Sequence, residues 1–233
     1  MVKAIFFDID DTLFPSSEFA ELARRNAMRA MIEMGIGRSE KELYEALMGV
    51  IRQKGSNYPN HFDLVCRKLK VKRPSRFVAA AVGAYHNTKT AIQPFPTVPR
   101  TLLALREEGY RLYVATNGEA TKQWDKLIRL QIALFFEDVF VSEEIGEEKS
   151  ASFFKKVLRA LNSRPETRDV GPQDCVMVGD REDADIAPAK AVGMVTIRVK
   201  SGKYAHTSSG ADFQITDLGE MERILNSLKR GKG

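Results

Sequence analysis

The chain has 233 residues, of which 43% are hydrophobic and 29% charged, so it can bury a substantial core and fits one large domain or one domain plus a modest insertion. Its formal net charge is +5, but 36 basic residues are spread among 31 acidic ones and the basic tail from Lys229 contains no aromatic residue, which argues against nucleic-acid binding. No apolar run has the length of a membrane span or a signal peptide, and Cys66 and Cys175 lie far apart, so we expect a cytoplasmic protein without membrane contact, disulfide or zinc site.

The first apolar run, Val2 to Phe7, predicts a buried strand. From residue 14 to residue 96, one amphipathic segment follows another and no strand intervenes, which predicts an inserted helical domain. The expected helices are Ser17 to Met34, Ser39 to Gln53, His61 to Leu69 and Pro74 to His86, with Ser17 and Ser39 as N-caps and Gly35 as a C-terminal stop. Residues 1–13 and 97–233 would then form the main domain.

Beyond residue 97, short apolar runs alternate with amphipathic stretches. The expected strands are Arg111 to Ala115, Asp138 to Val141, Cys175 to Val178, Thr196 to Val199 and, more weakly, Phe213 to Ile215. The expected helices are Glu119 to Arg129, Ser152 to Leu161 and Leu218 to Leu228. This alternation predicts an α/β core with a Rossmann-like, doubly wound parallel sheet and helices on both faces.

Polar residues follow four of these runs. They are Asp8-Ile9-Asp10-Asp11-Thr12 after the first strand, Thr116-Asn117-Gly118 after the second, Lys149 beyond the third and Gly179-Asp180 after the fourth. Each residue alone also suits a strand end, a turn or a helix cap. Because ligands of open parallel sheets bind beyond the carboxyl ends of the strands, the four together predict one shared site.

The acidic residues of this predicted site require a counter-charge. Asp8, Asp10, Asp180 and Asp185 cannot all be ionised at neutral pH at one sheet edge unless a cation offsets their repulsion. Carboxylates without a Cys or His cluster favour Mg²⁺, which binds few carboxylates together with water and phosphate oxygens. The expected substrate is therefore a phosphate ester.

The order of the motifs resembles that of the haloacid dehalogenase superfamily of phosphohydrolases. The run Phe6 to Leu13 is similar to the family's D-x-D-x-T-L motif, and Gly179 to Asp185 is similar to its G-D-x-x-x-x-D motif. Family members often carry Lys-Pro where this chain has Lys149 and Ser150, and Ser150 can cap the following helix instead. The alternative interpretation of Lys149 is that it balances the acidic run of Glu143, Glu144, Glu147 and Glu148.

The resemblance implies a role for each motif. Asp8 would be the nucleophile that forms an aspartyl-phosphate, and Asp10 would act first as the acid and then as the base. Asp8, Asp180 and the backbone carbonyl of Asp10 would hold Mg²⁺. Thr116, Asn117 and Lys149 would bind the phosphoryl oxygens.

The last motif offers two further carboxylates. By the family spacing, Asp185 would support the metal waters or Lys149 from the second coordination shell. Asp183 is the alternative for that role, and we expect it to be a helix N-cap.

The helical insertion resembles the cap of the phosphoglycolate-phosphatase-like branch, which closes over the site and restricts it to small substrates. The implied substrate is a small phosphorylated metabolite such as phosphoglycolate, a triose phosphate or another sugar phosphate. Dehalogenases lack the second Asp of the first motif, so Asp10 argues against dehalogenation. A phosphomutase with the same aspartyl-phosphate is an alternative, as is a catalytically silent binding protein, although the latter would be expected to have lost Asp8 or Asp10.

Substrate specificity is expected on polar side chains of the inserted domain. The candidates are Asn57, Asn60, His61 and His86. For the two histidines, a place at the surface or at a helix cap is the alternative. Nothing in the sequence indicates an oligomeric state.

Overall fold

The computed structural model describes residues 2–56 and 58–230, so Asn57 lies outside the described residues. The chain divides into two compact units, one formed by Met1–Ser17 with Gln93–Gly233 and the other by Glu18–Ile92. Within the described residues, no helix is long and apolar enough to cross a membrane.

The first unit is built on a six-stranded parallel sheet with the order β3-β2-β1-β4-β5-β6. Its strands are β1 (Ala4–Phe7), β2 (Arg111–Thr116), β3 (Asp138–Val141), β4 (Cys175–Gly179), β5 (Val195–Val199) and β6 (Phe213–Ile215). The predicted α/β class and parallel sheet are confirmed, and each strand lies within two residues of its predicted ends.

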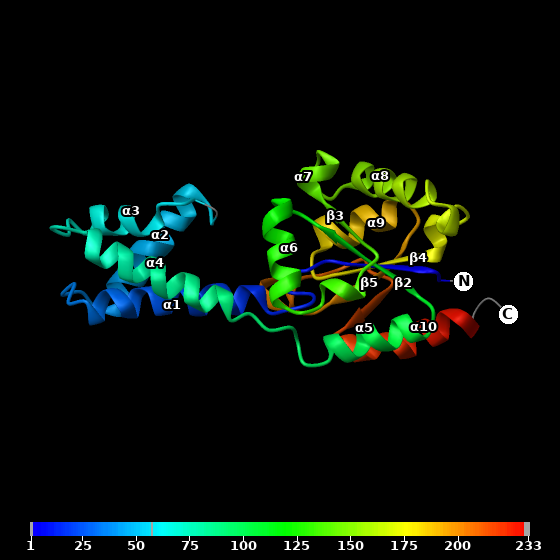
Figure 1. Cartoon of the computed structure of the whole chain (residues 1–233), viewed down its shortest axis with the longest axis horizontal. Coiled ribbons are helices and arrows are strands. Elements are labelled where there is room, and N and C mark those ends of the chain that lie inside the picture. The colour runs from blue at the N-terminus through cyan, green and yellow to red at the C-terminus, as the bar shows by residue number, and fades with distance from the viewer. Residues whose placement is uncertain (1, 57, 231–233) are drawn as a thin grey trace. The chain divides into compact units, whose positions relative to one another are not determined.

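Helices cover both faces of this sheet. They are α5 (Val98–Glu107), α6 (Ala120–Arg129), α7 (Ser142–Ile145), α8 (Ala151–Asn162), α9 (Ala187–Ala191) and α10 (Met221–Arg230). Figure 1 shows α8 and α9 on one face and α5 and α10 on the other. The sequence did not predict α5, which begins beside Pro99, a residue that suits the first turn of a helix because it lacks an N–H.

The central strand β1 is buried on both faces, as expected for a parallel sheet covered by two layers of helices. On one face, Phe6 stacks on Tyr113 with ring centroids 5.1 Å apart, and both belong to the core that α8 closes with Phe153 and Phe154. Phe7 lies in register with Val114 of β2 and Val178 of β4. The residues that follow these positions therefore emerge together at the carboxyl edge of the sheet.

The second unit is helical. It contains most of α1 (Ser16–Glu33), with α2 (Glu40–Lys54), α3 (His61–Lys68) and α4 (Ser75–Thr90). Its core includes Met28, Met31, Leu43, Phe62 and Phe77. The predicted N-cap Ser39 is confirmed and is part of a capping box with Glu42.

The predicted N-cap Ser17 is wrong, because Ser17 lies inside the first turn of α1. The carboxylate of Asp11 takes the capping place by accepting a hydrogen bond of 2.8 Å from the Ser17 backbone N–H and another from its hydroxyl. A carboxylate at a helix N-terminus also interacts favourably with the helix dipole.

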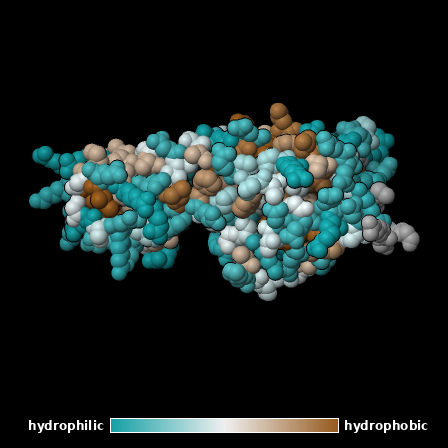
Figure 2. Space-filling view, turned by 90° about the horizontal axis from the view of Figure 1, so that it is seen from below, coloured by the Kyte–Doolittle hydropathy of each residue, from teal (hydrophilic) through white to brown (hydrophobic). Residues whose placement is uncertain are grey.

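The surface is mainly hydrophilic in the view of Figure 2, and hydrophobic residues form separate groups. The exposed large hydrophobic side chains among the described residues are Leu22, Ile32, Met34, Val82, Leu103, Trp124, Ile128 and Leu134.

Candidate active site

The turn after β1 carries the first group of acidic residues. Asp8 continues the strand pairing, since its N–H donates to Val178 O at 2.9 Å, and its side chain is buried. The chain then reverses: Leu13 N donates to Ile9 O at 2.9 Å, and Asp11 has a φ of 55°, in the left-handed region that Asp tolerates better than most residues. The bond from Asp11 to Ser17 anchors this turn to the start of α1. Asp8 is therefore presented on a short, braced loop.

The turn after β2 carries Thr116 and Asn117. Thr116 is buried at the last position of the strand. The side-chain oxygen of Asn117 accepts a hydrogen bond of 2.7 Å from the backbone N–H of Lys149. Gly118 has a φ of 133° and donates its N–H to Ser142 Oγ at 2.9 Å, so the turn is tied to the segment that follows β3.

Lys149 supplies a buried cation. Its ammonium donates to Asp8, to Asp185 and to the backbone oxygen of Ala115 at 3.3 Å, which engages all three of its hydrogens. Burial disfavours the charged form, but the carboxylates of Asp185 and Asp8 outweigh it and raise the pKa of Lys149 above its ordinary value.

Lys149 does not balance the acidic run that precedes it, so that alternative interpretation is wrong. Glu147 pairs instead with Lys156 at 2.7 Å. Ser150 stands where members of the haloacid dehalogenase superfamily often have Pro. It caps α8 by accepting a hydrogen bond from Phe153 N.

The turn after β4 brings Asp180 and Asp185 to the same place. Gly179 is required there, because a Cβ on it would lie 2.4 Å from Cγ of Asp185. Asp185 is fully buried and accepts from Lys149 and from Arg181 N, the latter at 2.9 Å.

Asp183 does not cap a helix, so that prediction is wrong. It lies within the π-helical turn Glu182–Ile186, and its carboxylate accepts two hydrogen bonds from the Arg181 guanidinium, at 2.6 and 3.0 Å. Its side chain is 68% exposed, which also separates it from the buried carboxylates.

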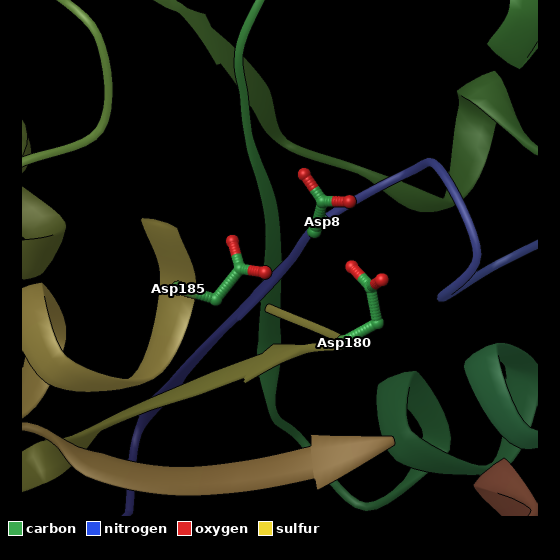
Figure 3. A group of neighbouring side chains, drawn as sticks. All are labelled: Asp8, Asp180 and Asp185. Atoms are coloured by element: carbon green, nitrogen blue, oxygen red, sulfur yellow. The ribbon is translucent and has the colours of Figure 1, made fainter. Parts of the chain in front are cut away.

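Three buried carboxylates form the centre of the site. Figure 3 shows Asp8, Asp180 and Asp185 facing a common space, the first two from neighbouring strand ends and Asp185 from the helical turn after β4, and one oxygen of each lies within 4.8 Å of the others. Burial is the main cause that raises the pKa of Asp8 to about 7, with Lys149 opposing it and Asp185 adding to it. Burial and the neighbouring carboxylates raise the pKa of Asp180 to about 8.

These charges fit a divalent cation. Among the described residues, Lys149 is the one cation paired with this cluster, through Asp8 and Asp185, so three carboxylates keep an excess of negative charge that burial makes unfavourable. Asp185 already accepts two hydrogen bonds, which leaves oxygens of Asp8 and Asp180 as the better ligands. Carboxylate oxygens without a nearby sulfur or imidazole ligand are the donor set of a hard cation.

Asp10 lies at the rim of the site, and its side chain is 42% exposed. Its Oδ2 accepts a hydrogen bond of 2.6 Å from Lys126 of α6. The sequence did not single out Lys126, because 116 residues separate it from Asp10. Only its place on an amphipathic helix that follows a site turn could have drawn attention to it.

Arg198 of β5 is a second residue that the sequence analysis missed. It is 1% exposed, and its guanidinium donates to the Asp180 carbonyl at 3.1 Å and to oxygens of Tyr204, Thr207 and Ser208. These hydrogen bonds fix the segment after β5 and the backbone of Asp180, whose carboxylate belongs to the buried cluster. An Arg inside a strand of otherwise uncharged residues was the available signal.

The candidates for specificity lie in the helical unit. Asn60 is exposed and precedes α3 without a side-chain cap. Nε2 of His61 lies 2.8 Å from the Gly55 carbonyl, and its ring contacts Tyr58. His86 is exposed beside Tyr85. The contacts of His61 agree with the alternative prediction for it, a place at the surface or at a helix cap.

Comparison with known proteins gives consistent results. A sequence model described as haloacid dehalogenase-like hydrolase matches residues 2–193. The chain is 48% identical to the glyceraldehyde 3-phosphate phosphatase of Methanopyrus kandleri over 96% of this chain and 94% of that protein. It is 41% identical to the enzyme of the same name from Methanocaldococcus jannaschii over 99% and 100% of the two chains. Among solved structures, the magnesium-bound HAD-hydrolase YfnB of Bacillus subtilis aligns with a TM-score of 0.66 and 19% identity, over 97% of this chain and 99% of that one, and shares the fold.

Proposed function

The chain belongs to the haloacid dehalogenase-like hydrolases and is a phosphatase of phosphoric monoesters, and we propose that it uses Mg²⁺ and Asp8 to hydrolyse a triose phosphate such as glyceraldehyde 3-phosphate. The observation that carries the mechanism is the contact of Lys149 with Asp8 inside the buried carboxylate cluster. The substrate rests on the relatives that share 41% and 48% of their residues with this chain over nearly its whole length.

In the proposed reaction, a carboxylate oxygen of Asp8 attacks phosphorus in line and the ester P–O bond breaks. The carboxyl group of Asp10 gives its proton to the leaving alkoxide. Water then attacks the phosphorus of the aspartyl-phosphate and gives a proton to Asp10, and the bond from phosphorus to Asp8 breaks. Phosphate leaves, and both carboxyl groups regain their starting states.

Other residues would hold the phosphoryl group while it moves. The Thr116 hydroxyl and the amide of Asn117 are donors at the end of β2, and Lys149 supplies positive charge beside Asp8. Asp185 would keep Lys149 in place from the side away from the substrate.

The metal would be held by Asp8, Asp180 and the backbone oxygen of Asp10. Mg²⁺ at that position would offset the carboxylate repulsion and withdraw charge from the phosphoryl oxygens. The raised pKa values of Asp8 and Asp180 support this assignment, because both groups need a cation to be ionised at neutral pH.

We also propose that the inserted helical region, expected at residues 14–96, is the cap that selects the substrate. A phosphomutase would use the same groups on Asp8 and Asp10 but return the phosphoryl group to an organic hydroxyl. The names of the relatives above favour transfer to water.

The test is a phosphate-release screen over glyceraldehyde 3-phosphate, phosphoglycolate and other small phosphomonoesters, with Mg²⁺ and with chelator. We expect release from a triose phosphate with Mg²⁺ that is lost with chelator and in Asp8→Asn. The matched control is Asp183→Asn, which removes an exposed carboxylate of the same site turn and should stay active. Turnover that persists in Asp8→Asn or in chelator would exclude the mechanism, and accumulation of an isomeric phosphate would identify a mutase.

A further inference from the structure

The contact between Lys126 and Asp10 differs from the other ion pairs of α6. Lys122 pairs with Glu119 at 2.6 Å and Arg129 with Asp125 at 2.8 Å, both within the helix or its cap. Lys126 reaches across the fold to the turn after β1, where its Nζ lies 2.6 Å from Asp10 Oδ2. The side chain of Lys126 is 25% exposed, against 63% for Lys122. Lys126 is therefore partly buried toward the site.

A buried glutamine supports Lys126. Gln123 lies three residues earlier on the same helix face, and its Oε1 is 3.1 Å from Lys126 Nζ. The same oxygen is 3.5 Å from Thr116 Oγ1. Gln123 is 5% exposed, and its amide nitrogen would lie 2.4 Å from a Cβ placed on Gly118, so it packs against the turn after β2. These contacts therefore run from Thr116 through Gln123 and Lys126 to Asp10, and they connect two turns of the site through α6.

The helix that carries these residues is itself fixed. Leu127, next to Lys126, is fully buried, and the N–H of Ala120 in the first turn donates to Glu143 at 2.8 Å. A lysine on a packed helix, held by a buried glutamine, has fewer rotamers to lose than an exposed one when it binds a carboxylate. This separates the pair from an ordinary surface ion pair, which contributes little.

We propose that Lys126 is a positioning residue for Asp10 and that it acts on the step in which the leaving group departs. Lys126 occupies Oδ2 of Asp10, and no described residue hydrogen-bonds Oδ1, so Oδ1 is the oxygen that exchanges the proton with the substrate. Fixing one carboxylate oxygen holds the other in a single orientation at the site. This inference rests on the proposed function, because it assigns a cause to the orientation of the acid in that mechanism.

The effect of losing Lys126 on the rate should therefore depend on the leaving group of the substrate. An alkoxide departs poorly without a proton, whereas a nitrophenolate departs without one. A misplaced Asp10 should therefore slow the hydrolysis of an alkyl phosphate and leave that of p-nitrophenyl phosphate little changed. General acid catalysis contributes about 100-fold to 10,000-fold, so partial loss of orientation should remove about 10-fold or more.

The experiment measures kcat/KM, which reports phosphoryl transfer to Asp8, for glyceraldehyde 3-phosphate and for p-nitrophenyl phosphate. The variants are Lys126→Met, Lys126→Arg, Asp10→Asn and the double variant, with Lys122→Met as the control on the same helix. We expect Lys126→Met to lose about 10-fold or more on the alkyl phosphate and less than about 3-fold on the aryl phosphate. We expect Lys126→Arg to recover part of the loss and Lys122→Met to match the wild type.

The double variant identifies the route of the effect. If Lys126 acts through Asp10, Lys126→Met should reduce kcat/KM no further in the Asp10→Asn background. Equal losses on both substrates, or additive losses in the double variant, would overturn the inference. Failure of the proposed function would look different, because the wild type itself would then release no phosphate or Asp8→Asn would remain active.

Discussion

The side-chain oxygen of Asn117 and the backbone N–H of Lys149 are joined by a hydrogen bond of 2.7 Å, although 32 residues separate them in the sequence. This bond fixes the backbone of Lys149 against the turn after β2, while its ammonium binds Asp8 and Asp185. The position of the buried cation is therefore set at both ends of the residue.

Replacing Lys149 by Met should leave Asp8 and Asp185 without their shared counter-charge. Removing one partner of a buried ion pair typically costs about 3–5 kcal/mol, and loss of a charge that stabilises the transition state lowers kcat by about 100-fold or more. Thermal unfolding and kcat with Mg²⁺ measure the two effects. Asn117→Ala, which keeps the ammonium but removes the backbone anchor and the proposed phosphoryl donor, should cost about 1 kcal/mol of stability. A Lys149→Met variant no less stable than Asn117→Ala would show that the buried ion pair does not stabilise the fold.

Replacing Asp180 by Asn should stabilise the metal-free protein at pH 8. The pKa of Asp180 is raised from 3.8 to about 8, so between about pH 4 and pH 8 the folded protein holds a proton that the unfolded chain has lost. Folded protein then binds more protons than unfolded chain, and the free energy of unfolding falls as pH rises through this window. The neutral amide avoids that loss, so Asp180→Asn should melt above the wild type at pH 8 and near it at pH 4, in chelator.

The control for this measurement is Asp183→Asn. Its hydrogen bond with Arg181 lowers the pKa of Asp183, so its charged form is favoured in the fold and its neutralisation should not raise the melting temperature at pH 8. With Mg²⁺ the order of the melting temperatures should reverse for Asp180, because the wild type should gain stability from the bound ion and Asp180→Asn removes a proposed ligand. An Asp180→Asn variant that melts below the wild type in chelator at pH 8 would contradict the prediction.

Two Gly→Ala substitutions should have opposite effects. At Gly179, a Cβ would lie 2.4 Å from Cγ of Asp185, so Ala must displace the carboxylate that holds Lys149, and both stability and kcat should fall. At Gly83, inside α4, nothing lies within 4 Å of an added Cβ, so Ala should stabilise the helix by about 0.5–1 kcal/mol. Denaturant unfolding measures both. A Gly179→Ala variant with wild-type stability and rate would show that the turn after β4 can yield.

Replacing Arg198 by Met should loosen the segment that follows β5. The guanidinium satisfies backbone oxygens of Asp180, Tyr204, Thr207 and Ser208, and bonds from a charged donor contribute about 1.5–3 kcal/mol each. We expect a loss of at least about 3 kcal/mol and faster proteolysis near residues 202–208. Arg223→Ala, at a side chain that is 84% exposed, should change stability by less than about 0.5 kcal/mol.

The sequence was sufficient for features that depend on local pattern. Asp138–Val141 and Phe213–Ile215 were predicted at their observed ends, because a short apolar run between turn signals marks a strand wherever it packs. The capping residues Ser39 and Ser150 were also predicted, because an N-cap side chain binds a backbone N–H only three residues away. The convergence of Asp8, Lys149 and Asp180 was predicted because ligands of an open parallel sheet bind beyond the carboxyl ends of its strands.

Features that depend on contacts across the fold were missed or misread. Ser17 looked like a cap by its own position, but Asp11 reaches it from the turn after β1. Asp183 looked like a cap as well, but the adjacent Arg181 binds it. Lys126 and Arg198 act over long sequence separations, and the local signals at these positions do not identify the partners that the side chains reach.

The place of β1 in the middle of the sheet has a consequence for synthesis. Asp8 is translated 141 residues before Lys149, and β1 pairs with β2 from residue 111 and with β4 from residue 175. These long-range pairings require closure of large loops before the sheet gains stability. A nascent or truncated chain that ends before Asp180 therefore contains Asp8, the proposed nucleophile, without the rest of the site.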